Sequence, residues 1–169
     1  MRIEESGMLF GEFDEANCFH IEESKIYNHV KGKGYKSVEF VLRRPEQNEL
    51  LFVEAKPDLP VVSNIKQFDK KIAEISQKFM DSLHLAIGIW FGEHNAKAVV
   101  PTGRDSFFTY GTQIVFVLVV KDRKVHLLFT TERIRRELKR EITLMRFKVL
   151  VLSEEDAIKL NLVIRDVGE

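Results

Sequence analysis

Residues 50–56 read Leu-Leu-Phe-Val-Glu-Ala-Lys, an apolar run that ends in a carboxylate and an ammonium. Such a short run of apolar side chains favours a buried strand, and Pro57 ends it because proline has no backbone N–H for a sheet hydrogen bond. Side chains two positions apart lie on the same face of a strand, so Glu54 and Lys56 project together. This stretch therefore predicts a strand that carries a charged pair at its end.

The preceding stretch, Ser37–Arg43, alternates between two faces, which predicts a second strand. One face carries three apolar side chains: Val38, Phe40 and Leu42. A polar turn at Arg44–Glu49 connects this strand to residues 50–56, so the two strands form an antiparallel hairpin. Glu39 points away from the face of the three apolar residues, and the hairpin brings it beside Glu54. Two carboxylates and a lysine in one place can bind a hard divalent cation and orient a water molecule or stabilise a phosphate oxyanion.

Helices are expected before and after this hairpin. Before it, Phe19–Val30 has apolar residues at spacings of three and four, with Glu23 on the same face. Read as a strand, the start of this stretch still gives Glu23 apolar neighbours, and in both readings Glu23 could add a third carboxylate to the site. After the hairpin, Ser63 or Asn64 can cap a long helix. Its apolar stripe consists of Ile65, Phe68, Ile72, Ile75, Phe79 and Leu83. Leu85–Phe91 extends this helix or forms a strand.

Three further elements are expected in the C-terminal half: a buried central strand at Ile114–Val120, a helix capped by Thr130 or Thr131, and a buried strand at Phe147–Leu152. Ser153 then opens a last short helix with a capping box. Gly92–Thr112 lacks a clear pattern, and is either a functional loop or hides a short strand near Ala98–Val100. This order of elements predicts a single α/β domain over residues 1–169, with a mixed four- to five-stranded sheet and helices on both faces.

The elements and their acidic residues resemble the PD-(D/E)xK, or restriction-endonuclease-like, superfamily. The core of that family is a helix, a strand hairpin, a helix, a strand, a helix and a strand, which covers most of this chain. Its motif is an acid on one strand, followed by Glu-x-Lys at the end of the next. The resemblance implies that Glu39 and Glu54 are metal ligands and that Lys56 is the catalytic lysine. Glu23 matches the first-helix glutamate of many members, so the resemblance implies that it is an additional catalytic residue or metal ligand. The cofactor that the resemblance implies is Mg²⁺ or Mn²⁺.

The chain departs from the family pattern at two positions. The first strand acid of the family is usually Asp, often after Pro, whereas here Glu39 follows Val38. Gln67 stands where some exonuclease-type members have an active-site glutamine, but Lys71 replaces the Tyr that follows four residues later. Glu-x-Lys also occurs twice more, at residues 23–25 and 137–139, in segments that are expected to be helical. Only the copy at residues 54–56 ends an apolar strand.

Charge is balanced overall, with 26 Lys and Arg against 26 Asp and Glu, which excludes a uniformly basic nucleic-acid coat. It is uneven along the chain, however, because residues 1–23 are acidic and residues 121–148 are basic. Two groups are dense enough to contact phosphates: Lys31, Lys33 and Lys36, and Arg135, Arg136 and Lys139. Interleaved glutamates leave a solvated helix face as the alternative for the second group.

The sequence thus supports three hypotheses. The first is a Mg²⁺- or Mn²⁺-dependent nuclease, with DNA favoured over RNA by the resemblance. The second is a catalytically silent nuclease-fold module that binds nucleic acid or a protein partner. The third is an assembly protein whose acidic and basic regions dock between protomers, for example as a homodimer. Cys18 is the only cysteine, and the longest apolar run is far shorter than the roughly 20 residues of a membrane span, so we expect a cytoplasmic protein without a membrane partner.

Overall fold

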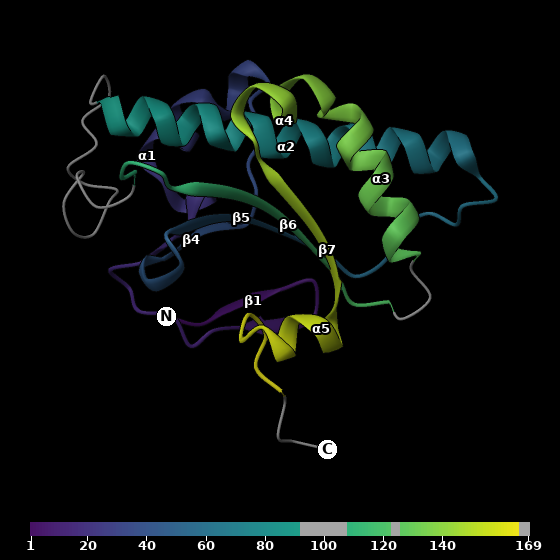
Figure 1. Cartoon of the computed structure of the whole chain (residues 1–169), viewed down its shortest axis with the longest axis horizontal. Coiled ribbons are helices and arrows are strands. Elements are labelled where there is room, and N and C mark those ends of the chain that lie inside the picture. The colour runs from purple at the N-terminus through teal and green to yellow at the C-terminus, as the bar shows by residue number, and fades with distance from the viewer. Residues whose placement is uncertain (92–107, 123–125, 166–169) are drawn as a thin grey trace.

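The computed structural model of the protein describes residues 1–91, 108–122 and 126–165. Its centre is a mixed sheet of five strands in the order β3-β4-β5-β6-β7 (Figure 1). These strands span Cys18–Phe19, Phe40–Arg44, Glu49–Lys56, Gln113–Val120 and Lys148–Ser153. β3, β4 and β5 are antiparallel neighbours, whereas β5, β6 and β7 run parallel to one another. The expected α/β fold with a mixed sheet is confirmed.

The larger helices cover one face of this sheet (Figure 1). α2 (Ile65–Phe91) follows β5 and precedes β6, and α3 (Leu127–Glu137) and α4 (Lys139–Met145) lie between β6 and β7 in the chain. Four short helices surround β4 in the sequence: η1 (Ile21–Glu23), α1 (Lys25–Val30), η2 (Lys31–Lys33) and η3 (Pro45–Gln47). The opposite face is covered by α5 (Glu154–Lys159) and by the hairpin of β1 (Ile3–Glu5) and β2 (Met8–Phe10).

Side chains alternate between the two faces of each strand, so the sheet has an apolar core on both sides. On the side of α2, Phe79 stacks on Phe116 of β6, with ring centroids 4.8 Å apart. On the opposite side, Phe10 packs edge-on against Phe40, with centroids 5.3 Å apart. All four rings are fully buried. Burial of one such side chain contributes about 2–3 kcal/mol, so these contacts hold α2 and the N-terminal hairpin against the sheet.

The helix expected over Phe19–Val30 is wrong in extent. Residues 18–19 instead pair with β4 as the edge strand β3, and α1 begins only at Lys25. Ser24 explains this late start, because its side chain accepts a hydrogen bond from the backbone N–H of Tyr27 (3.0 Å) and caps the helix. Glu23 therefore ends η1 instead of lying on the face of a longer helix.

Two expectations for the C-terminal half are also corrected. β7 is not a buried strand throughout, because it forms the edge of the sheet and leaves Lys148 and Leu150 exposed. The helix expected from Thr130 or Thr131 begins earlier, at Leu127, and Thr131 donates a hydrogen bond to the carbonyl of Leu127 (2.8 Å), as hydroxyls inside helices do. The capping prediction for Ser153 is confirmed, since its hydroxyl accepts a hydrogen bond from the backbone N–H of Asp156 (3.1 Å).

Leu85–Phe91 continues α2, which excludes the alternative of a strand there. The predicted short strand near Ala98–Val100, and most of the segment Gly92–Thr112, lie outside the described residues. Among the helices that the structure describes, none is long and apolar enough to cross a membrane.

The stacking of Phe79 on β6 gives a first prediction. Phe79→Ala should lower the free energy of unfolding by about 3–5 kcal/mol, because it removes a fully buried ring and leaves a cavity under α2. Urea unfolding followed by circular dichroism measures this loss. Gln77→Ala, at an exposed position of the same helix, should change stability by less than about 0.5 kcal/mol. Equal stabilities of the two variants would contradict this packing of α2.

Candidate active site

The register of β4 and β5 places two carboxylates side by side. Val41 pairs with Phe52 and Phe40 with Val53 in the antiparallel ladder, and the backbone N–H of Glu39 donates to the carbonyl of Val53 (3.0 Å). The same register, continued by one residue, sets Glu39 opposite Glu54. Both carboxylates then lie on the sheet face that α2 covers, since that face also carries Val41 and Phe52.

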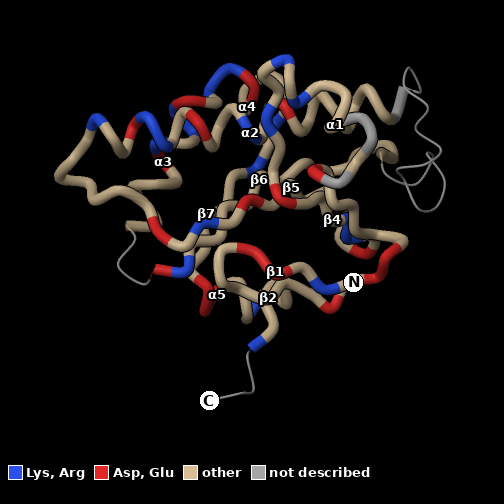
Figure 2. Tube along the Cα trace, turned by 180° about the vertical axis from the view of Figure 1, so that it is seen from behind, with Lys and Arg blue, Asp and Glu red and all other residues tan. Residues whose placement is uncertain are grey.

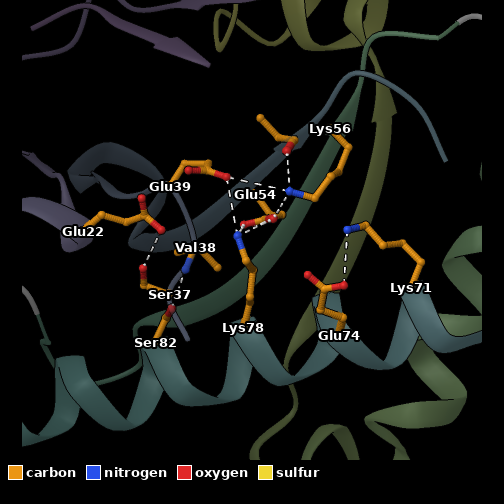
Figure 3. Close-up of polar contacts among 11 residues, drawn as sticks. Glu22, Ser37, Val38, Glu39, Glu54, Lys56, Lys71, Glu74, Lys78 and Ser82 are labelled. Atoms are coloured by element: carbon orange, nitrogen blue, oxygen red, sulfur yellow. Dashed lines mark hydrogen bonds and ion pairs between the residues drawn. The ribbon is translucent and has the colours of Figure 1, made fainter. Parts of the chain in front are cut away.

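Lys56 joins the two carboxylates from the same strand as Glu54. Its Nζ lies 2.5 Å from Oε1 of Glu54 and 3.9 Å from Oε1 of Glu39, and it donates a hydrogen bond to the carbonyl of Ala55 (3.0 Å). Glu54 has no exposed surface, and Glu39 is only 7% exposed. The structure therefore brings together three of the four residues that the sequence analysis selected as the site (Figure 3).

A second lysine, Lys78 of α2, completes this cluster and is not found by the sequence analysis. Its Nζ lies 2.8 Å from Oε1 of Glu54, donates to Oε2 of the same residue (3.1 Å), and lies 3.6 Å from Oε1 of Glu39. The available signal is a polar row beside the apolar stripe of α2, in which Lys71, Glu74 and Lys78 are spaced by three and four residues. We call Glu39, Glu54, Lys56 and Lys78 the carboxylate–lysine cluster.

Glu23, the fourth predicted site residue, is placed only by its backbone, at the end of η1. Its side chain lies outside the part of the chain that the structure describes. The preceding residue, Glu22, has an exposed side chain that accepts a hydrogen bond from the hydroxyl of Ser37 (3.1 Å). Figure 3 shows Glu22 next to Glu39 at the rim of the cluster.

Two hydrogen bonds to side chains of α2 fix the segment that leads into Glu39. The Ser82 hydroxyl accepts from the backbone N–H of Val38 (2.8 Å), and the Asp81 carboxylate accepts from that of Lys36 (3.0 Å). Because Lys78 lies one turn earlier on α2, the same helix positions Glu39 and contributes one of the lysines that face it.

Burial changes the proton affinity of this cluster. Burial first, and then the charge of Glu54, raise the pKa of Glu39 to about 7, although the ammonium of Lys78 opposes this effect. Burial alone would lower the pKa of Lys78, but the negative charges of Glu54 and Glu39 outweigh it and the pKa is raised. Lys78 is thus a cation at neutral pH, while Glu39 exchanges a proton there.

The donor atoms of the cluster fit a hard divalent cation, because Mg²⁺ and Mn²⁺ prefer carboxylate oxygens. Oε1 of Glu54 is buried and lies within ion-pair distance of both ammonium groups, but neither meets it at the angle of a hydrogen bond. Among the described side chains, no group of three His, Cys, Asp or Glu residues gathers around one point. Glu39 and Glu54 would therefore supply two ligands, and water or phosphate oxygens the remaining ones, as is common for Mg²⁺.

The predicted phosphate-binding residues lie on different sides of α2. Lys31 and Lys33 are exposed on η2, and Lys36 is half-buried in the segment before β4, so this group adjoins the side of Glu39. Arg135 and Arg136 are exposed at the end of α3, which packs on α2 and on β7 at the other edge of the sheet, and Lys139 begins α4. The structure does not bring the second group next to the carboxylate–lysine cluster.

Gln67 is exposed near the start of α2, three turns before Lys78, and makes no contact with the cluster that the structure records. No protein-family model, curated protein or solved structure matches the chain. The function has to be inferred from the geometry and charge of the cluster.

The raised pKa of Glu39 predicts a specific pH dependence of stability. The pKa in the folded protein lies above the ordinary value of 4.5, so the folded state keeps a proton that the unfolded chain loses. Stability should therefore fall as the pH rises from about 4.5 to about 7 and level off above, by about 3 kcal/mol at most. Glu39→Gln removes this contribution and should be more stable than the wild type at pH 8.

Urea unfolding at pH 5, 6, 7 and 8 measures the difference between variant and wild type. Glu46→Gln, at an exposed position of η3, serves as the control and should follow the wild type at every pH. If the difference between Glu39→Gln and the wild type does not change with pH, Glu39 does not titrate in this range.

Proposed function

We propose that the protein is a divalent-metal-dependent nuclease with a restriction-endonuclease-like core, acting on DNA in preference to RNA. The observation that carries this proposal is the meeting of Glu39 and Glu54 across the hairpin, with the ammonium of Lys56 within 4 Å of both. The order of elements α1, β4, β5, α2, β6, α3 and β7 supports it, because the family resemblance implies a helix, a hairpin, and then alternating helices and strands.

The residues of the cluster have separate tasks in this reaction. Mg²⁺ or Mn²⁺ held by Glu39 and Glu54 would supply positive charge that acidifies a bound water and offsets the charge of the phosphate. Lys56 is close enough to both ligands to donate a hydrogen bond to the attacking water or to a phosphate oxygen. In hydrolysis the attacking water loses a proton to the solvent as its oxygen adds to phosphorus, the bridging P–O bond breaks, and the leaving oxygen takes up a proton from the solvent. Glu23 remains a proposed additional ligand or water-orienting base.

Nucleic acid would be held by the two basic groups on either side of α2. Figure 2 shows Lys and Arg positions along α3 and α4, where Asp and Glu positions alternate with them. Lys31, Lys33 and Lys36 extend the basic surface on the side of Glu39. Exposed lysines and arginines bind phosphates through charge and counterion release, without reading the base sequence.

A second candidate function is a catalytically silent module that binds nucleic acid or a protein partner. Lys78 favours this candidate, because its ammonium and that of Lys56 balance both carboxylates without any metal ion. The two candidates differ in cleavage, and this difference can be measured directly.

Lys56→Ala tests catalysis while both carboxylates stay in place. With Mg²⁺ or Mn²⁺, cleavage of plasmid and oligonucleotide DNA by the variant should fall by about 100-fold or more, because the group that places the nucleophile is lost. DNA affinity should change little. Lys66→Ala, on the exposed first turn of α2, is the matched control and should cleave like the wild type. A wild type that cuts neither DNA nor RNA would make the silent module the better description.

Replacing Arg135 and Arg136 together by alanine tests the interface. Binding of DNA should weaken, and the slope of log affinity against log salt should become shallower by about one unit for each lost phosphate contact. Fluorescence anisotropy at several salt concentrations measures both quantities. Lys159→Ala, on the opposite face of the sheet, should bind like the wild type. Unchanged binding by the double variant would exclude the end of α3 from the interface.

A further inference from the structure

Lys78 makes the same contacts that a metal ion in the cluster would need. Its Nζ lies 2.8 Å from Oε1 of Glu54 and 3.6 Å from Oε1 of Glu39, so it bridges the two proposed ligands. It also donates to Oε2 of Glu54, which gives this carboxylate a partner on both oxygens. The ammonium thus competes with a metal ion for oxygen atoms as well as for space.

The charges of the cluster strengthen this competition. Even when both carboxylates are ionised, the two ammonium groups of Lys56 and Lys78 already balance their charge. A divalent cation added to all four would leave a surplus of positive charge in a buried place, where charges are weakly screened. A lysine side chain is ordinarily a cation at neutral pH. Lys78 would therefore make room for a metal ion by moving its ammonium group away from the two carboxylates.

Lys78 is better placed to move than Lys56. Lys56 extends from the central part of the sheet and is also bonded to the carbonyl of Ala55 (3.0 Å). Lys78 reaches the cluster from α2, and the hydrogen bond that its ammonium donates is to Glu54 itself, so no backbone group of the described residues holds it in the site. One acidic side chain lies at the rim of the cluster, next to Glu39: that of Glu22. A displaced ammonium would find a new partner there.

We propose that Lys78 is an internal competitor for the metal site: its ammonium bridges Glu39 and Glu54, and it must swing away for a divalent cation to bind. This inference rests on the proposed metal site and adds its regulation. Lys78 acts through the two carboxylates and is a positioning residue. It keeps the buried carboxylates paired whenever metal is scarce, and it weakens the affinity for metal, so the cation binds only at a concentration high enough to displace it.

Lys78→Met removes the charge and keeps most of the apolar stem. Mn²⁺ binding, measured by calorimetry without nucleic acid, should become tighter than in the wild type by about tenfold or more, because no ammonium has to be displaced. In EDTA the variant should melt at a lower temperature than the wild type, since two buried carboxylates are left with one lysine, and Mn²⁺ should restore this loss. Lys78→Gln provides a second measurement if Lys78→Met does not fold.

Three controls define the site. Lys71→Met removes a lysine seven residues earlier on α2, which pairs with Glu74 (3.3 Å), and should leave Mn²⁺ affinity unchanged. Lys78→Arg keeps the positive charge and should not gain affinity. Adding Glu54→Gln to Lys78→Met should abolish the tight binding, which assigns it to this cluster.

The outcomes separate this inference from the proposed function. Equal Mn²⁺ affinity of the wild type and Lys78→Met overturns the role of Lys78 and leaves the nuclease proposal standing. Binding by Lys78→Met but not by the wild type at millimolar metal supports the role of Lys78 and overturns the nuclease proposal for the natural chain. If neither protein binds Mn²⁺, both proposals are wrong.

Discussion

The burial of Glu54 is the constraint that determines which side chains must surround it. A carboxylate with no exposed surface is very unfavourable unless opposite charges and hydrogen bonds replace the lost water. Lys56 is supplied by the same strand and Lys78 by the helix that crosses above it. The charge of Glu54 can stay buried only if α2 is docked in one place, so the ion pair and the apolar core of Phe79 and Phe116 depend on each other.

Such a cluster is a poor way to stabilise a fold. The attraction within a buried ion pair seldom compensates for the free energy needed to remove both charges from water. Apolar residues of similar volume often give a protein of equal or higher stability. Here a second carboxylate, Glu39, is held next to the first, and its pKa is raised to about 7 by burial and by the charge of Glu54. The arrangement keeps two carboxyl groups together at a stability cost. Binding a cation is a use for such a pair, and this physical argument supports the proposed function independently of the family resemblance.

The sequence predicts those parts of the fold and site that depend on local periodicity. β5, β6 and α2 have unbroken apolar patterns, and alternation places Glu39, Glu54 and Lys56 on one face. The alternation does not extend to Val38, which packs in the core under α2 and not with Phe40 and Leu42, because β4 begins only at Phe40. Lys78 is not predictable in this way. Neighbouring positions on a helix differ by about 100°, so a residue beside the apolar stripe faces the sheet or the solvent according to how the helix is rotated when it docks. The helix predicted over Phe19–Val30 is wrong for a different reason. The capping hydroxyl of Ser24 and the pairing of a two-residue strand with β4 outweigh a weak helical pattern.

The two candidate functions share one geometry and differ in the freedom of one side chain. If the ammonium of Lys78 is held in place by the cluster, the carboxylates are permanently paired and the fold serves as a binding module. If it exchanges with a divalent cation, the same carboxylates become ligands and Lys56 can act on a phosphate. Lys56 is bonded to its own strand and is common to both states, whereas Lys78 comes from a helix and reaches the site along a flexible stem. Under the proposed function, the choice between enzyme and module depends on the equilibrium between the Lys78 ammonium and a cation, and not on the positions of Glu39, Glu54 and Lys56.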